Sequence, residues 1–301
     1  MKQVLLAIAL TAGAVLAHAD QKTLTIIWPF GMGDTQAQYS RSLVDELNKN
    51  QKTYTFILEN KPGAGATIGA RHVASTPNSI LASSTAFFVR PNFYPEESHK
   101  LEDFKPLITQ CAAPMIIVSK RYQSWRDIDS QARINIGISG LGATSHLMAM
   151  EIKKRYPNAV PIPYKGTREA SIDAANGNLD MSVAFIGEVE GLLDEKKLYA
   201  LGISGPKSVR GIPTLESQGF AGVKEVVNMH SLIVPKNMPD TQYEELRAMV
   251  VQAATAESVQ RAYKTDYCEA SNLGSKLTVN WFSGQIALWK RLSQGVSIGD
   301  N

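Results

Sequence analysis

A glycine-rich segment that follows a strand-like run limits the folds open to this chain. The segment is Asn60–Ala70, Asn-Lys-Pro-Gly-Ala-Gly-Ala-Thr-Ile-Gly-Ala, and the run before it is Tyr54–Leu58. We expect Thr67 to cap a helix that continues through Val73. Glycines let backbone amides face a ligand, and the start of a helix attracts anions. Such turns are common in α/β proteins, so the segment alone leaves a structural turn and an anion site both open.

The same order of strand, turn and helix recurs along the chain. Turns such as Phe30–Asp34 and Ser139–Ser145 lead into segments with helical spacing, including the later Asp240–Ala254 and Lys276–Leu292. This alternation predicts an α/β fold, in which ligands bind at the carboxyl ends of the strands. The predicted strands are Thr23–Trp28, Tyr54–Leu58, Ile80–Ser83, Met115–Val118, Ile134–Ile138, Val160–Tyr164, Leu179–Phe185, Leu198–Ser204 and Met229–Pro235.

The N-terminal residues 1–19 have the pattern of a secretory signal peptide. Lys2 precedes the apolar run Val4–Leu16, and Ala17-His18-Ala19 forms a small-x-small cleavage site. We therefore expect a periplasmic protein cleaved after Ala19; a buried N-terminal helix is the alternative. No later stretch reaches the roughly 18 uninterrupted apolar residues of a membrane span.

The 301 residues suffice for two domains, and the net charge of +3 is scattered, which gives no sign of nucleic-acid binding. Cys111 and Cys268 are either one long-range disulfide, which an oxidising compartment permits, or two small buried hydrophobic residues.

Catalytic and cofactor motifs are weak in this sequence. The five histidines have no metal-ligand spacing, and Gly137–Leu141 lacks the last glycine of a nucleophile elbow. Gly63–Gly69 imitates a dinucleotide fingerprint, but Asn60–Pro62 separates it from the strand. We expect no metal, no cofactor and no enzymatic activity, and an exported hydrolase is disfavoured.

Short motifs along the chain resemble, in the same order, the extracytoplasmic solute-binding proteins of tripartite tricarboxylate transporters, the Bug family. These motifs are Pro29-Phe30, Asn60–Gly69, Leu101–Pro106, Gly142–Leu147, Pro163–Gly166, Gly177–Asp180, Leu198–Leu201, Ile212–Glu216 and Leu232–Pro235.

The resemblance implies a two-domain flytrap fold in which each domain is a mostly parallel sheet flanked by helices. We expect domain one to comprise residues 20–120 and 232–301 and domain two residues 121–231, with a ligand cleft between them. The chain would cross the hinge twice, near Ser119–Trp125 and Met229–Pro235.

The resemblance also implies a small organic acid as ligand: a mono-, di- or tricarboxylate or an aromatic acid. A monomer would deliver it to membrane transporter subunits or, alternatively, present it to a membrane sensor protein. The implied ligand-facing residues of domain one are Phe30, Gly31, Met32, Gly33, Gly63, Ala64, Gly65, Ala66, Ser84 and Thr85. Those of domain two are Ser139, Gly142, Ala143, Thr144, Tyr164, Asp180 and Phe185.

Several of these positions have a second interpretation. Thr144 and Ser145 could be helix caps, and Tyr164 could be a core residue with its hydroxyl in water. Asp180 lies in a predicted strand, where aspartate is disfavoured, which favours a role in the site.

The first turn departs from the family pattern, Pro-Phe-x-x-Gly-Gly-x-x-Asp. Counting from Pro29 puts Asp34 at the second glycine and Ala37 at the aspartate, and Pro77–Ser79 replaces the usual Asp-Gly-Tyr. Asp34 is either a helix cap facing away from the cleft or a ligand-facing residue. In the second case it shifts specificity toward a ligand with an amine or amide, or a neutral aromatic acid, and Asp34→Gly should tighten dicarboxylate binding.

Overall fold

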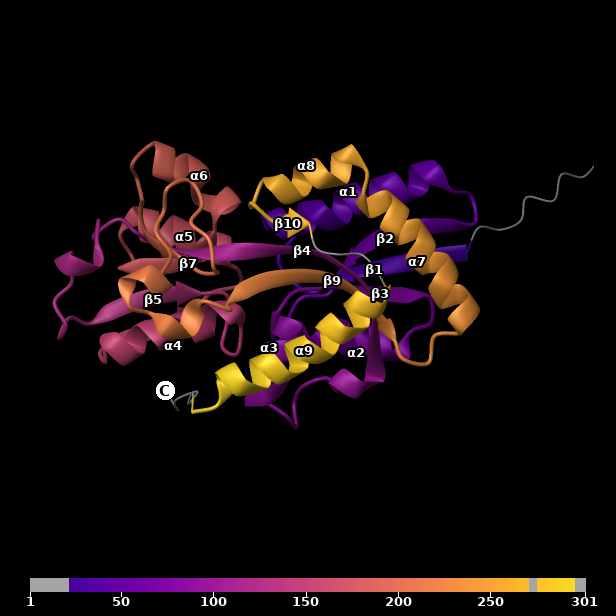
Figure 1. Ribbon diagram of the computed structural model, residues 1–301, viewed down its shortest axis with the longest axis horizontal. Helices are drawn as coiled ribbons and strands as arrows, with labels where there is room; N and C mark the ends of the chain where they lie inside the picture. Colours follow the sequence, from indigo (N-terminus) through magenta and orange to yellow (C-terminus); the bar gives the residue numbers. More distant parts are fainter. Residues whose placement is uncertain (1–21, 271–274, 296–301) are drawn as a thin grey trace, which may run out of the picture.

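The computed structural model describes residues 22–270 and 275–295, so the predicted signal peptide 1–19 lies outside the described residues. Two lobes lie side by side and share a continuous sheet (Figure 1). The first lobe contains β1 (Lys22–Trp28), α1 (Thr35–Asn50), β2 (Tyr54–Asn60), α2 (Thr67–Ser75), β3 (Ser79–Ser83), α3 (Ala86–Phe93), β9 (Val227–Pro235), α7 (Asp240–Ala254), α8 (Glu257–Lys264), β10 (Glu269–Ala270) and α9 (Ser275–Ser293). The second lobe contains β5 (Ile134–Ile138), α4 (Thr144–Arg155), β6 (Ala159–Pro163), α5 (Thr167–Asn176), β7 (Met181–Phe185), α6 (Ile186–Asp194) and β8 (Tyr199–Ile203).

The sheet is mixed rather than mostly parallel. Its strands follow the order β2-β1-β3-β9-β4-β7-β5-β6, where β4 is Phe104–Ser119. The parallel pairs join β1 to β2 and β3, and β5 to β6 and β7, as expected from the strand–turn–helix units. Each antiparallel pair contains β4 or β9, the two long strands at the centre of the sheet.

β4 carries the chain from one lobe to the other. Its residues Phe104–Pro114 pair with β9, and Met115–Ser119 pair with β7 and β8. The chain returns to the first lobe where β9 begins at Val227. Residues 115–119 thus pair with strands of the second lobe, and residues 227–231 pair with strands of the first lobe and with β4.

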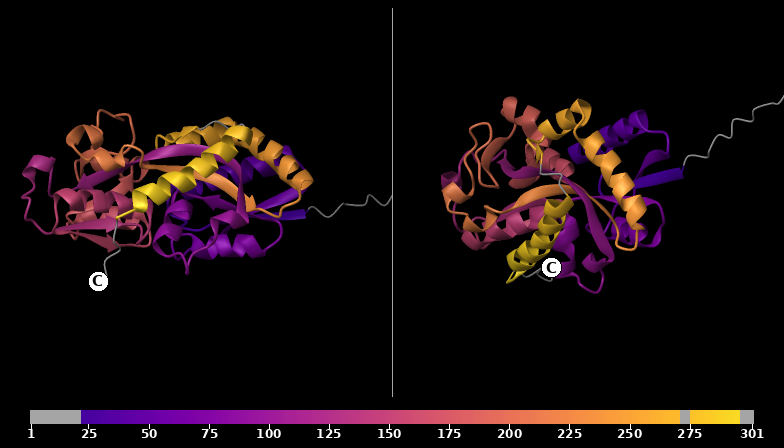
Figure 2. Two further views of the ribbon diagram at one scale, coloured as in Figure 1. Left: turned by 60° about the horizontal axis from the view of Figure 1, so that its bottom comes forward. Right: turned by 45° about the vertical axis from the view of Figure 1, so that its right-hand side comes forward.

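Helices cover both faces of the sheet in each lobe (Figure 2). In β1, Leu24 and Ile26 pack with α1 and α7, whereas Ile27 points to the opposite face with Phe87 of α3 and Trp289 of α9. This alternation follows the two-residue period of a strand. In the second lobe, α4 packs on one face and α5 and α6 on the other.

Cys111 of β4 and Cys268 form a disulfide that links positions 157 residues apart. It ties the segment after α8 to the central strand, since β10 pairs with β4 directly beside it. Within residues 22–270 and 275–295, no helix is long and apolar enough to cross a membrane.

Candidate ligand-binding site

A pocket lies between the two lobes, where five strands end and five helices begin. β1, β3, β5, β6 and β7 end beside it, and α1, α3, α4, α5 and α6 start there. Its space, including the open mouth, is about 380 Å³. The lining residues are Phe30, Asp34, Gln36, Ser84, Ala86, Met115, Ser139, Ala143, Thr144, Ser145, Gly166, Thr167, Phe185 and Asn228. This is the edge at which the order of strands and helices predicts a ligand site.

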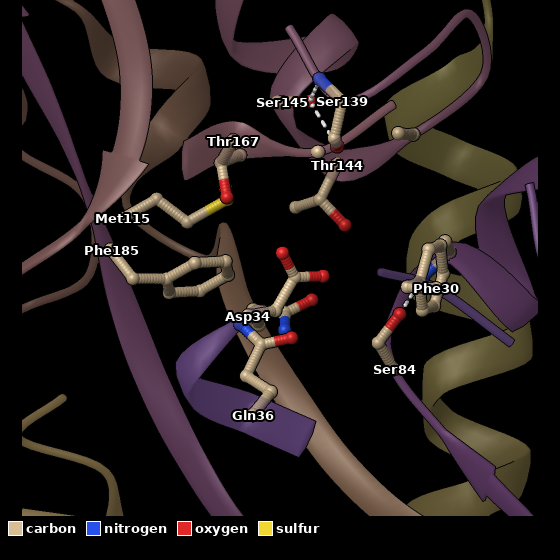
Figure 3. Close-up of a pocket in the computed structure, with 14 residues that line it drawn as sticks. Phe30, Asp34, Gln36, Ser84, Met115, Ser139, Thr144, Ser145, Thr167 and Phe185 are labelled. Carbon is tan, nitrogen blue, oxygen red and sulfur yellow. Dashed lines mark hydrogen bonds between the residues drawn. The ribbon is translucent and has the colours of Figure 1, made fainter. Parts of the chain in front are cut away.

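The chemistry of the pocket wall comes from helix starts and small polar side chains (Figure 3). The first amides of a helix lack partners within it and, together with the helix dipole, attract anions. Gln36 Nε2 and Thr144 Oγ1 are also buried with no hydrogen-bond partner in the described part of the chain. Both side chains line the pocket, and Gln36 is exposed by 5% and Thr144 by 4%. Buried polar groups normally have partners, so these two remain available to a ligand.

The hydroxyls at the start of α4 do not cap this helix. Its N-cap residue is Ala143, and no side chain in the described part of the chain makes a capping hydrogen bond there. Ser145 Oγ accepts a hydrogen bond of 3.0 Å from Ser139 N and lies 2.9 Å from Ser139 Oγ. The capping interpretation is thus wrong for Thr144 and Ser145. Thr67 also fails as a cap, because Ala66 holds that position in α2 and the Thr67 hydroxyl has no partner among the described residues.

Asp34 projects its carboxylate into the middle of the pocket (Figure 3). It occupies the N-cap position of α1 but makes no side-chain capping bond, so the expectation of a cap facing away from the cleft is wrong. Its side chain is exposed by only 7%. Burial, with the nearby carboxylates of Glu169 and Asp266, raises the pKa of Asp34 to about 7, and the Arg168 cation opposes this rise.

Two further carboxyl groups, the partly buried Glu188 and the buried Asp266, lie near Asp34. Glu188 at the start of α6 accepts hydrogen bonds from Thr167 Oγ1 (2.8 Å) and Phe185 N (3.3 Å). Burial, with the charges of Asp266 and Asp34, raises the pKa of Glu188 to about 8. Burial also raises the pKa of Asp266. The pocket therefore combines anion-attracting helix starts with a concentration of buried acid.

Asp266 connects the lobes beside this site. Its Oδ2 accepts a hydrogen bond from Tyr39 of α1 (2.6 Å) and another from Thr35, and its Oδ1 accepts one from Gly187 N of α6 (2.9 Å). Sequence reasoning did not identify this residue, because it lies 227 positions from Tyr39 in the chain.

Arg90 of α3 makes a second contact between the lobes. Its Nη1 donates to Leu141 O (3.2 Å), and its guanidinium lies 3.8 Å from the centre of the Tyr94 ring. A Cβ at Gly65 would lie 3.0 Å from Arg90 Cδ, and one at Gly142 would lie 3.5 Å from it. The predicted ligand residues Gly65 and Gly142 thus pack against Arg90 instead of lining the pocket.

The other predicted positions divide between the pocket and supporting roles. Those that line the pocket are Phe30, Asp34, Ser84, Ser139, Ala143, Thr144 and Phe185. Those absent from its lining are Gly31, Met32, Gly33, Gly63, Ala64, Gly65, Ala66, Thr85, Gly142, Tyr164 and Asp180.

For three of the residues that do not line the pocket, the structure shows other contacts of the side chain. Thr85 Oγ1 donates to Val227 O and accepts from Met229 N, which fixes the end of β3 to β9. The Tyr164 hydroxyl donates to Asp173 at 2.7 Å. Asp180 lies at the far end of β7 from Phe185, where it binds Arg121 at 2.9 Å.

Two lobes of mixed α/β sheet with a pocket at their strand ends define a two-domain periplasmic-binding-protein fold. The profile described as "Tripartite tricarboxylate transporter family receptor" (TctC) matches residues 40–298, and the chain belongs to this family. The periplasmic binding protein BugD is 24% identical, with a TM-score of 0.81 over 91% of this chain and 97% of BugD. MatC of Rhodopseudomonas palustris with bound malate is 18% identical, with a TM-score of 0.81 over 91% and 99%. Rpa4515 of R. palustris with adipate is 19% identical, with a TM-score of 0.82 over 92% and 97%.

Proposed function

We propose that this protein is a periplasmic receptor that captures a small organic acid and delivers it to a membrane transporter of the tripartite tricarboxylate type. The observation that carries the proposal is the pocket between the lobes, where five helix starts meet Gln36 Nε2 and Thr144 Oγ1, two donors without a partner among the described residues. Charge-assisted hydrogen bonds from such donors are the usual means of holding a carboxylate. The family membership and the malate- and adipate-bound relatives support this class of ligand.

Binding would act by joining the two walls of the pocket. Ser84 and Gln36 belong to the first lobe, whereas Thr144 and Thr167 belong to the second. A ligand that contacts both walls stabilises the closed arrangement over any more open one, and a transporter can recognise that shape. Release of the acid unchanged distinguishes this role from catalysis.

The test begins with native mass spectrometry of the purified mature protein, followed by denaturation and identification of any released small molecule. Titration calorimetry with malate, adipate and other small acids then gives the affinities. A binding free energy of about 8 kcal/mol corresponds to a micromolar dissociation constant. We expect at least one acid to bind at one site per chain and to be recovered unchanged. Conversion of the acid to another compound would indicate an enzyme, and failure of every acid to bind would refute the proposed receptor function.

Delivery to a transporter needs a separate test in cells. We expect deletion of the gene to abolish uptake of the bound acid and to leave the change in gene expression that the acid induces unaffected. Loss of the response with normal uptake would instead indicate the sensor role.

A further inference from the structure

We propose that the ligand is an acid that also carries a protonated amine, such as a small amino acid, and that Asp34 binds its ammonium group. This inference rests on the proposed receptor function and specifies its ligand class. It begins with the position of Asp34, whose carboxylate lies inside the pocket and is exposed by only 7%. Among the described residues, no ion pair or hydrogen bond is made by this carboxylate. A buried carboxylate is costly unless a cation or donors accompany it, so an ammonium group of the ligand would supply the missing partner.

The surroundings of Asp34 strengthen the attraction for a cation. Glu188 and Asp266 lie near it, and the groups that donate hydrogen bonds to these two acids belong to Thr167, Phe185, Tyr39, Thr35 and Gly187, none of which carries a positive charge. The exposed Arg168 is a cation that acts on Asp34 in the opposite direction to Glu169 and Asp266. Glu188 Oε1 is buried without a partner in the described part of the chain. Gly166 brings the second lobe against Asp34, since a Cβ there would lie 3.0 Å from Asp34 Oδ1. The ammonium would therefore lie where both lobes meet.

A metal ion fits this arrangement less well. The described residues contain no group of three His, Cys, Asp or Glu side chains placed to hold one. Of the described residues that line the pocket, Asp34 is the only acidic one, and one carboxylate with a few hydrogen-bond acceptors suits an ammonium group.

The rest of the pocket suits a carboxylate. Gln36 Nε2 and Thr144 Oγ1 are buried donors with no partner within residues 22–270 and 275–295, and the amides at the start of α4 adjoin Thr144. Phe30, Met115 and Phe185 add apolar surface on which a short carbon chain can pack. A single small ligand with both charges would satisfy Asp34 and these donors together.

A competing interpretation is that Asp34 is protonated and donates a hydrogen bond to a second ligand carboxylate. The two interpretations differ in their response to Asp34→Asn, because an asparagine amide can still donate to a carboxylate but has no charge for an ammonium group. They also differ in ligand preference, because protonated Asp34 favours dicarboxylates without an amine.

The experiment measures affinities for matched acids that differ at one substituent. The probes are propionate, lactate and alanine, then succinate, malate and aspartate, then butyrate and 4-aminobutyrate, each titrated calorimetrically into the dialysed mature protein. We expect the amine-bearing member of at least one set to bind about 10- to 100-fold more tightly than its unsubstituted and hydroxylated counterparts, as expected for a charged hydrogen bond. Asp34→Asn should remove this preference, and Asp34→Gly should favour dicarboxylates.

Glu169→Gln serves as the matched control. Glu169 is an exposed acid whose charge acts on Asp34, but it does not line the pocket. We expect this variant to keep the preference within about threefold, and circular dichroism checks that each variant is folded.

The outcomes separate this inference from the proposed function. If plain carboxylates bind as tightly as their amine-bearing counterparts, or if Asp34→Asn keeps the preference for amines, the inference is wrong while the receptor role stands. If neither plain nor amine-bearing acids bind, the receptor role itself fails.

Discussion

At the residue scale, Asp34 shows a conflict between stability and binding. Its pKa rises from 3.8 to about 7 because the carboxyl group is buried among other acids. The folded protein therefore binds more protons than the unfolded chain between these values, and stability falls as the pH rises through this window. The full penalty is present above about pH 7. Such a residue is expected where function, rather than folding, determines the side chain.

Asp34→Asn should therefore stabilise the protein at alkaline pH. At about 1.36 kcal/mol per pKa unit, the shift in the pKa of Asp34 corresponds to at most about 4 kcal/mol of unfolding free energy. We expect denaturant titration at pH 8 to show a gain of about 1–4 kcal/mol that shrinks as the pH falls toward 3.8 and disappears only about one unit below it, where both states are protonated. A loss of stability at pH 8 would mean that the carboxylate makes a stabilising contact in the folded state.

The pH dependence of binding follows from the same group. An ammonium ligand needs ionised Asp34, so its affinity should fall as the pH is lowered through about 7. The other charged groups around Asp34 are Glu169 and Arg168 of α5, Glu188 of α6 and Asp266 after α8. Calorimetry between pH 5.5 and 8.5 with wild type and Asp34→Asn isolates the contribution of Asp34. An affinity that rises at low pH would support the protonated, carboxylate-binding form.

At the element scale, Arg90 joins α3 to the loop after β5. Its bond to Leu141 O exists only when the lobes are together, so removing it should disfavour the closed state. We expect Arg90→Ala to weaken ligand binding by about 3- to 30-fold, the range for a hydrogen bond from a charged group, with the binding stoichiometry unchanged. Arg121→Ala is the control, since Arg121 binds Asp180 at the distant end of β7. Equal effects of the two variants would argue that the bond from Arg90 to Leu141 O does not stabilise the closed state.

The strand–turn–helix units could be predicted from sequence because each carries its own apolar periodicity. The helix Asp240–Ala254 was predicted with the observed ends, and β1 and β5 differ by at most one residue. β4 was recognised only as Met115–Val118, because Pro106 and Pro114 argue against a strand. The register shifts in β4 at Pro106/Ile108 and Thr109/Cys111 accommodate this irregular strand. α3 was missed because Pro91 lies within it and its apolar residues are not periodic.

The pocket could be predicted as a place but only partly as a set of residues. Loops at strand ends are visible in the sequence, and they placed Phe30, Ser84, Ser139 and Phe185 near one another. Gln36 and Asn228 carry no local signal, because they reach the pocket only through the turn of α1 and the position of β9. The family resemblance assigned Gly63–Ala66 to the ligand, whereas in the structure Gly65 makes room for Arg90 and Gly63 for Ile68.

At the scale of the whole molecule, two chain crossings and a few side-chain contacts hold the lobes together. β4 changes partners between Pro114 and Met115, and the chain returns just before Val227. Asp266 and Arg90 add contacts on either side of this connection. The disulfide lies in the same region, since Cys268 is two residues beyond Asp266 and is bonded to Cys111 in β4. We infer that it holds Asp266 in place for its bond to Gly187.

The paired substitution Cys111→Ala and Cys268→Ala tests this coupling. Opening a link across 157 residues should lower the unfolding free energy by about 2–5 kcal/mol, mainly by releasing the unfolded chain. If the disulfide also positions Asp266, ligand affinity should fall, and Asp266→Asn should then weaken binding less in the cysteine-free protein than in wild type. Additive effects on affinity, measured in a double-mutant cycle, would limit the disulfide to stability. Because Asp266 receives hydrogen bonds from both lobes, a non-additive result would connect the covalent link directly to closure around the ligand.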